Sequence, residues 1–394
     1  MKSTSAFSAI LSAGLFIVAC QSLVSSSSDD RAQPGTLSFD EIEARLAAPG
    51  AHVAFVPTEP LGISTRFASV IPLDNPLTPA KVELGRQLYF DKRLSLDQTV
   101  SCATCHDPQK GWTDNLPVSS GIKGQKGGRS APTVINRLLG KSQFWDGRAA
   151  TLEEQAVGPI GNPIEMGFTT EGAAQRLNSI PGYRVQFERV FGGAASPEFI
   201  GKAIAAFERG IVSGANKNDY YEAALPYFDR EIEADDEPEF KAKVEKALDG
   251  EKAHRMSEAA ERGRALYFGK ASCSLCHVGE DLTDELFHNL GVGFDQPKPD
   301  LGRFDKTGIE ADKGAFRTPT LRNIALTAPY MHDGSAKTLM DVVEHYDKGG
   351  IANPWLSNKI VPLKLTPEEK QDLVTFMEEA LTGSITPVEV PRLP

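Results

Sequence analysis

The sequence contains little cysteine and no excess of positive charge. Only 5 cysteines occur among 394 residues, too few for disulfides to hold together a protein of this size. The formal net charge of -11 argues against nucleic-acid binding, which needs concentrated lysine and arginine. Hydrophobic residues make up 40% and charged residues 24%. This composition excludes collagen-like and wholly disordered chains and suits a globular protein of two or three domains.

Apolar runs long enough to cross a bilayer are also missing, since a spanning helix takes about 20 apolar residues. The run from residue 6 follows Lys2 and ends in the letters IVAC at Cys20, which resembles the lipobox of bacterial lipoproteins. This resemblance implies that residues 1–19 are a signal peptide and that Cys20 carries a lipid anchor to the membrane. Residues 20–60 would then form a tether and N-terminal extension of a periplasmic protein at the outer membrane. The alternative is a plain cleaved signal with a chance cysteine.

The other four cysteines belong to two C-x-x-C-H motifs. The motif residues are Cys102, Cys105, His106, Cys273, Cys276 and His277. Two thiols at this spacing can bond the two vinyl groups of one haem, and the next residue can ligate the iron. The motifs therefore predict two covalently bound haem c groups, with the two histidines as axial ligands.

Three other uses of paired cysteines are weaker explanations. A zinc site would place two C-x-x-C pairs close together, whereas these lie about 170 residues apart in the sequence. A thioredoxin-like redox pair would need a βαβ context, which the sequence does not show. Two chance disulfides would leave both trailing histidines unexplained.

The sequence around the two motifs is an internal repeat. The matched segments are 83–90 with 261–268, 131–136 with 318–323, and 145–152 with 332–339. The first pair, ELGRQLYF and ERGRALYF, has apolar residues at helical spacing and predicts a helix before each motif. Thr151 and Thr338 read as N-caps of a later helix in each copy.

The repeat predicts a mainly α protein with two cytochrome c-like haem domains. The first domain is expected at residues 61–228 and the second at 257–394. Between them lies an acidic insertion at 229–256. It reads most simply as a solvated linker, and alternatively as a docking surface for a basic donor cytochrome.

The repeat also predicts what faces each iron. Fourteen residues beyond Trp145 and its counterpart His332 lie Pro159 and Tyr346. Proline cannot ligate iron, whereas a tyrosine phenolate can. If this position faces the distal side, the first haem is open to a small oxidant and the second is capped.

At these motifs the chain resembles the bacterial di-haem cytochrome c peroxidase and MauG superfamily, from about residue 76 to residue 383. The sequences FWDGR at 144–148, LEEQA at 152–156 and PYMHDGS at 329–335 carry the resemblance. It implies an enzyme that reduces hydrogen peroxide at one haem. Through the other haem it would oxidise a protein electron donor or a protein substrate.

The resemblance also implies roles for individual residues. Gln155, Pro159 and Glu165 fall at the peroxide pocket, where Glu165 would be the acid/base that moves a proton between the peroxide oxygens. Trp145 falls between the two haems as a stepping stone for electrons. From the residues alone, Glu165 could be a solvated surface acid, Gln155 part of a polar helix face, and Trp145 a core aromatic.

Two departures from the conventional peroxidases favour the MauG-like branch. Those enzymes close the resting first haem with a histidine, yet residues 107–253 contain none. They also cap the second haem with methionine, where this sequence has Tyr346. His345 is a competing ligand one position away, and Met331 and Met340 are weaker candidates.

A third departure concerns calcium. The family site uses an asparagine side chain and two backbone carbonyls. The carbonyl positions match Thr327 and Pro329, whereas the asparagine position holds Ser130, a weaker oxygen ligand. Calcium is therefore a possible further cofactor.

Two other functions remain open on the sequence. One is a conventional cytochrome c peroxidase that detoxifies peroxide with a small cytochrome or cupredoxin donor. The other is an electron-transfer cytochrome without peroxide chemistry. A MauG-like enzyme could also modify a partner protein by forming radicals on its tryptophan or tyrosine.

Overall fold

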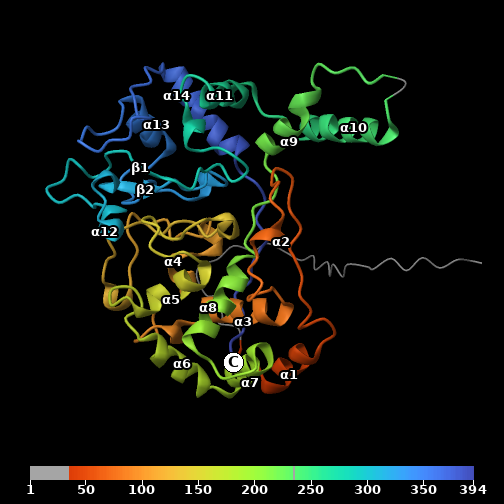
Figure 1. Cartoon of the computed structure of the whole chain (residues 1–394), viewed down its shortest axis with the longest axis vertical. Helices are drawn as coiled ribbons and strands as arrows, with labels where there is room; N and C mark the ends of the chain where they lie inside the picture. Colours follow the sequence, from red (N-terminus) through yellow and green to blue (C-terminus); the bar gives the residue numbers. More distant parts are fainter. Residues whose placement is uncertain (1–34, 234–235) are drawn as a thin grey trace, which may run out of the picture. The chain divides into compact units, whose positions relative to one another are not determined.

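The computed structural model describes residues 35–233 and 236–394, so the predicted signal peptide and Cys20 lie outside the described residues. The described chain is mainly helical, as expected (Figure 1). Among the residues described, no helix is long and apolar enough to cross a membrane. In the described part of the chain, strands β1 (Phe287–Asn289) and β2 (Ala315–Arg317) pair antiparallel, with His288 opposite Phe316.

The helices in chain order are α1 (Phe39–Ala47), α2 (Phe67–Val70), α3 (Pro79–Phe90), α4 (Cys102–Cys105), α5 (Leu152–Gly161), α6 (Thr170–Asn178), α7 (Pro181–Phe191), α8 (Pro197–Glu208), α9 (Lys217–Ala224), α10 (Pro238–Ala253), α11 (Glu258–Phe268), α12 (Phe304–Thr307), α13 (Leu339–Asp347) and α14 (Pro367–Thr375). Short helical turns include η4 (Arg137–Leu139), η6 (Cys273–Leu275) and η9 (Phe376–Ala380).

The helices that the repeat predicts are present in both halves, although α3 and α11 begin a few residues earlier than predicted. The helices expected at 83–90 and 261–268 are the C-terminal parts of α3 and α11. The hydroxyl of Thr151 accepts a hydrogen bond from the Glu154 N–H at 3.1 Å, which caps α5. Thr338 caps α13 in the same way through Asp341, also at 3.1 Å. Both N-cap predictions are confirmed, because each hydroxyl satisfies a backbone donor that lacks a helical partner.

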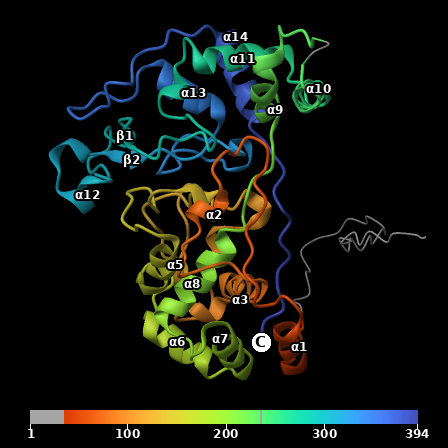
Figure 2. The ribbon, with the colours of Figure 1, turned by 45° about the vertical axis from the view of Figure 1, so that its right-hand side comes forward.

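Each half has its own hydrophobic core and the same helix crossing within it. In the first half α3 packs on α8, and in the second α11 packs on α14 (Figure 2). Gly85 of α3 allows the crossing, since a Cβ there would lie 1.9 Å from the Ala203 carbonyl oxygen. At Gly263 of α11 a Cβ would lie 2.0 Å from the Asp372 carbonyl oxygen. The two crossings are therefore built alike.

Two asparagines of the repeat hold the halves in matching ways. Asn136 and Asn323 both adopt left-handed backbone conformations, with φ of 59° and 58°, which asparagine tolerates better than most residues. The Asn136 side chain donates to Asp281 of the second half at 2.8 Å. The Asn323 side chain donates to the Ser213 hydroxyl of the first half at 2.7 Å. Each copy thus reaches into the other.

Backbone hydrogen bonds across the halves follow the same reciprocal pattern. The Ser130 N–H donates to the His332 carbonyl at 2.7 Å, and the Arg317 N–H donates to the Trp145 carbonyl at 2.8 Å. Ser130 corresponds to Arg317 in the repeat, and Trp145 corresponds to His332. The contact is therefore self-complementary, like the interface of a two-fold dimer.

The C-terminal tail returns to the first half, which the sequence did not predict. Ile385 and Val388 pack against the first core, and Figure 1 shows the C-terminus beside α7 and α1. The Leu37 N–H donates to the Leu393 carbonyl at 2.8 Å. The tail lies within the predicted domain 257–394, but its apolar side chains pack against the hydrophobic core of the first half.

Candidate functional site

The first C-x-x-C-H motif lies on the short helix α4 and the residue after it. His106 follows α4, and its Nδ1 lies 3.3 Å from the carbonyl oxygen of Trp112. A carbonyl can only accept, so this contact places the ring proton on Nδ1 and leaves Nε2 as the free ligand atom. The Tyr89 hydroxyl of α3 donates to the His106 carbonyl at 3.3 Å. The imidazole is therefore oriented before any metal binds.

The three motif residues line one cavity of about 340 Å³. Gln155 and Pro159 from α5, and Glu165 from the loop after it, line the same cavity. The sequence predicted all three at the peroxide pocket, and the structure places them together in the cavity of the first motif. Pro159 has no N–H to donate to the Gln155 carbonyl, so the last turn of α5 lacks a helical bond there.

Glu165 is a half-buried carboxyl inside this cavity, which differs from a solvated surface acid. The side-chain amide of Asn162 donates to one of its oxygens at 2.9 Å. Burial raises its pKa, while the nearby charge of Arg148 and the Asn162 hydrogen bond partly oppose the rise. A carboxyl with a raised pKa is better able to exchange protons near neutral pH.

The second motif repeats the arrangement of the first. His277 Nδ1 lies 3.2 Å from the carbonyl oxygen of Leu282, which again leaves Nε2 free. The Tyr267 hydroxyl of α11 donates to the His277 carbonyl, as Tyr89 of α3 does in the first half. Burial lowers the pKa of His277 to about 4, so its ring is neutral and able to ligate a metal at pH 7.

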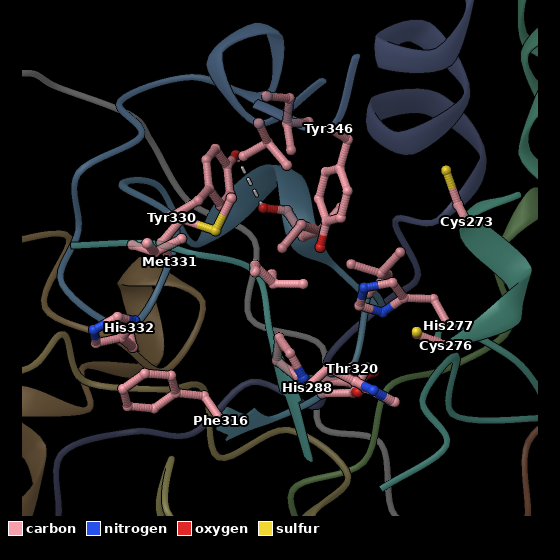
Figure 3. A pocket seen from close by; sticks show the side chains of 18 of the residues that line it. Cys273, Cys276, His277, His288, Phe316, Thr320, Tyr330, Met331, His332 and Tyr346 are labelled. Carbon is pink, nitrogen blue, oxygen red and sulfur yellow. Dashed lines mark hydrogen bonds between the residues drawn. The ribbon is translucent and has the colours of Figure 1, made fainter. Parts of the chain in front are cut away.

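The second motif lines a separate cavity of about 210 Å³ that also contains Tyr346. Figure 3 shows the Tyr346 hydroxyl turned into this cavity toward the His277 ring. His345 points elsewhere, since its Nε2 lies 3.0 Å from the Leu290 carbonyl oxygen. Met331 lines the cavity, whereas Met340 is not among the described residues that do. Position and direction therefore favour Tyr346 among the four candidates.

Trp145 lines both cavities. Its indole N–H donates to the Ser130 carbonyl at 2.8 Å, which fixes the ring in place. Trp145 is therefore shared by the two cavities, as the family resemblance expects of a stepping stone for electrons.

Two arginines that line both cavities were missed by the sequence reasoning. Arg137 and Arg317 each bind the same Glu285 oxygen, at 2.9 and 2.8 Å. All three side chains are buried, with 7%, 3% and 7% of Arg137, Arg317 and Glu285 exposed. Arg317 directly precedes the repeat segment 318–323, but only the fold brings it to Glu285 and Arg137.

The residues of each cavity fit a covalently bound haem. The four cysteines of the two motifs form no disulfide in the structure. They are divided between two cavities, so the two pairs cannot form one zinc knuckle. In each cavity two thiols and one oriented imidazole converge, which is the donor set that haem c requires.

The three residues of the predicted calcium site lie together at the second cavity. Ser130, Thr327 and Pro329 all line the second cavity. The Asn115 side chain donates to the carbonyls of Leu326 and Ala328 at 3.1 and 2.8 Å, so it fixes the backbone on either side of Thr327. These hydrogen bonds order the loop around Thr327. Calcium binding there stays a prediction.

Comparison with known proteins adds a family match. Residues 79–225 match the family described as di-haem cytochrome c peroxidase. The sequence is 39% identical over 330 residues to the methylamine utilization protein MauG of Methylorubrum extorquens, covering 82% of this chain and 84% of that protein. It is 36% identical over 346 residues to the cytochrome c551 peroxidase of Nitrosomonas europaea, covering 85% and 92%.

A solved structure agrees with these sequence matches. A MauG-like protein associated with microbial copper homeostasis superposes with a TM-score of 0.68 at 35% identity, covering 79% of this chain and 92% of that chain.

Proposed function

We propose that this chain, which belongs to the di-haem cytochrome c peroxidase and MauG family, reduces hydrogen peroxide at an open first haem and takes electrons from a protein partner through a second haem ligated by Tyr346. Family membership makes it a di-haem peroxidase or MauG-like oxidoreductase with two haem c groups. The division of labour between two cytochrome c-like domains is our proposal.

One observation carries the proposal: two cavities built on the same plan differ at the position that would face the iron. In the first cavity that position is Pro159, beside Gln155 and Glu165. In the second it is Tyr346. An electron-transfer cytochrome has no need of this asymmetry, because both of its haems could be closed. A bound haem supplies the redox-active iron, and the protein decides which iron is accessible.

Glu165 is suited to handle the proton of bound peroxide. Its carboxyl lies in the first cavity, is held by Asn162 and has a raised pKa because it is buried. It would accept a proton from the near oxygen of peroxide and return it to the far oxygen, which leaves as water. Gln155 of the same cavity would position the peroxide by hydrogen bonding. Trp145 would carry electrons between the two cavities.

We place the protein on the MauG-like branch by its own residues, because identities of 39% and 36% to members of both branches do not separate them. Residues 107–253 hold no histidine that could close the first haem. An anionic Tyr346 would stabilise ferric iron in the second site, where methionine would raise the potential. The partner is then a redox protein or a protein substrate outside the cytoplasm. Calcium at Ser130, Thr327 and Pro329 and the lipid on Cys20 remain predictions.

Substitution of Glu165 tests the proposed acid/base. Glu165→Gln keeps the shape and the hydrogen bond to Asn162 but cannot accept the proton. We expect its reaction with peroxide to slow by about 10²–10⁴-fold, measured by rapid mixing of the ferric protein with peroxide. Glu154→Gln, on the exposed side of α5, is the matched control and should react at the wild-type rate. A Glu165→Gln protein that reacts at the full rate would remove Glu165 from the mechanism.

A further inference from the structure

A second carboxyl of the first cavity has no part in the mechanism above. Glu208 is the last residue of α8, lines the cavity of the first motif and is only 5% exposed. Its Oε2 is fully buried and has no hydrogen-bond partner among the described residues. A buried carboxyl without a partner costs folding free energy, so a residue chosen only to fill this space would be apolar.

The second half of the repeat has such an apolar residue at the matching position. Gly85 crosses α8 at Ala203 and Phe207, and Gly263 crosses the second helix at Asp372 and Phe376. The residue after each phenylalanine is therefore equivalent: Glu208 in the first half and Met377 in the second. Met377 is 7% exposed and lines the second cavity. The same place in the fold thus presents a carboxyl to the first haem site and a thioether to the second.

The charged groups around Glu208 compensate its charge only in part. Arg209, next to it, is held by Glu153 of α5 at 2.6 Å. Arg137 of η4 is held by Glu285. Tyr89 of α3 is a buried phenol whose pKa is raised well above its usual range.

Cys102 of α4 also lies near Glu208, and it would become a neutral thioether once haem is attached. Burial raises the pKa of Glu208 to about 8, against a partial opposing effect of Arg209. The carboxyl is therefore close to balance between its neutral and charged forms near neutral pH.

We propose that Glu208 couples electron transfer at the first haem to proton transfer: its carboxylate takes up one proton when that haem gains an electron and releases it when the electron leaves. The physical reason is charge compensation, because a carboxylate is favoured beside ferric iron and a neutral acid beside ferrous iron. The electron comes from the protein donor and the proton from solvent, and the only bond formed or broken is the carboxyl O–H. Met377 cannot do this, so the second haem lacks the coupling.

This inference rests on the proposed function, since it takes the first cavity to be the peroxidatic haem site. It adds a source for the protons that are consumed when peroxide is reduced to water. Reduction of one peroxide to two waters consumes two electrons and two protons, whereas Glu165 ends each cycle in the state in which it began. A proton stored on Glu208 with the electron is available when the electron is used.

The test is the midpoint potential of each haem as a function of pH in the haem-loaded protein, followed by the separate spectral signals of the two irons. In the wild type the first potential should fall as pH rises, because the proton uptake that accompanies reduction becomes less favourable. The limit is a tenfold change in the oxidised-to-reduced ratio per pH unit, equivalent to about 59 mV for one electron. Glu208→Gln and Glu208→Met should each remove most of this slope.

The controls are chosen to separate this inference from the function on which it rests. Glu171→Gln, an exposed acid on α6, should keep the wild-type slope of the first haem. The potential of the second haem should depend on pH in the same way in the wild type and in every variant. Retention of the full slope in Glu208→Gln, which preserves the shape of the site, or absence of a slope in the wild type, would overturn the proposal. Failure of the proposed function would appear instead as a wild-type protein whose first haem does not react with peroxide.

Discussion

At the scale of a single residue, the proposed ligand Tyr346 would decide the character of the second cavity. Its phenol is buried, and burial raises its pKa far above the usual range. A bound iron reverses this effect, since a coordinated metal favours the deprotonated ligand. Under our proposal the result is a phenolate–iron bond, which stabilises the ferric state. The neighbouring His345 is held by the Leu290 carbonyl at 3.0 Å, and the proposal gives it no part in binding iron.

Replacing Tyr346 with methionine should raise the midpoint potential of the second haem. Tyr346→Met should raise the midpoint potential of the second haem on the order of 0.1–0.3 V, within the span of about 0.8 V that axial ligands set. His345→Asn, which changes the adjacent residue, should leave the potential near the wild-type value. Potentiometry of both variants checks the assignment, and a large shift in His345→Asn with none in Tyr346→Met would assign the ligand to His345.

The sequence predicts some of these residues well because their chemistry is local. Two thiols and a histidine must lie within five consecutive residues to hold one haem, so Cys102 and His106 can be found without a fold. Glu165 and Tyr346 needed the repeat and a family resemblance. Glu208 and Arg137 belong to no local pattern, since only the packing of α8 and η4 brings them to a cavity.

At the scale of elements, the helix crossings position both haem sites. Tyr89 and Tyr267, which hold the two histidine loops through their carbonyls, each lie four residues beyond the glycine of the crossing. Close approach at Gly85 and Gly263 therefore sets where each tyrosine, and so each imidazole, is placed. The glycines of the two repeated segments, Gly85 and Gly263, were visible in the sequence. The helices that they contact could not be predicted from it.

A methyl group at the first crossing should separate the helices. Gly85→Ala places a Cβ 1.9 Å from a carbonyl oxygen of α8. We expect a loss of roughly 1–3 kcal/mol in the free energy of unfolding from overpacking, despite the better helix propensity of alanine. Chemical denaturation measures this loss. Gly161→Ala, at the end of α5 where a Cβ meets nothing within 4 Å, should be neutral or stabilising by up to about 1 kcal/mol. Equal stabilities of the two variants would contradict the account.

At the scale of the whole molecule, buried charge joins the two halves. Arg137 comes from the first half, whereas Glu285 and Arg317 come from the second, and both arginines line both cavities. The Lys141 N–H also donates to Glu285 at 3.0 Å. The sequence predicted that two copies would exist, but not how they meet. A reciprocal interface depends on side chains about 150 residues apart in the sequence, which no periodicity reveals.

Removing the shared carboxylate should destabilise the molecule strongly. Glu285→Gln leaves two buried guanidinium groups without their anion, and breaking a buried ion pair in this way costs roughly 3–5 kcal/mol. The matched control is Glu310→Gln, which removes an exposed pair with Lys313 (68% and 21% exposed) and should cost no more than about 1 kcal/mol. Thermal unfolding of the haem-loaded protein compares them, and a Glu285→Gln protein as stable as the control would show that this cluster does not hold the halves.

Electron paramagnetic resonance of the ferric protein as isolated tests whether the first haem is open and the second is closed by Tyr346. We expect one high-spin signal from the haem of His106 and one low-spin signal from the haem of His277. Two low-spin signals would contradict this expectation, because a protein ligand would then close the first haem as well.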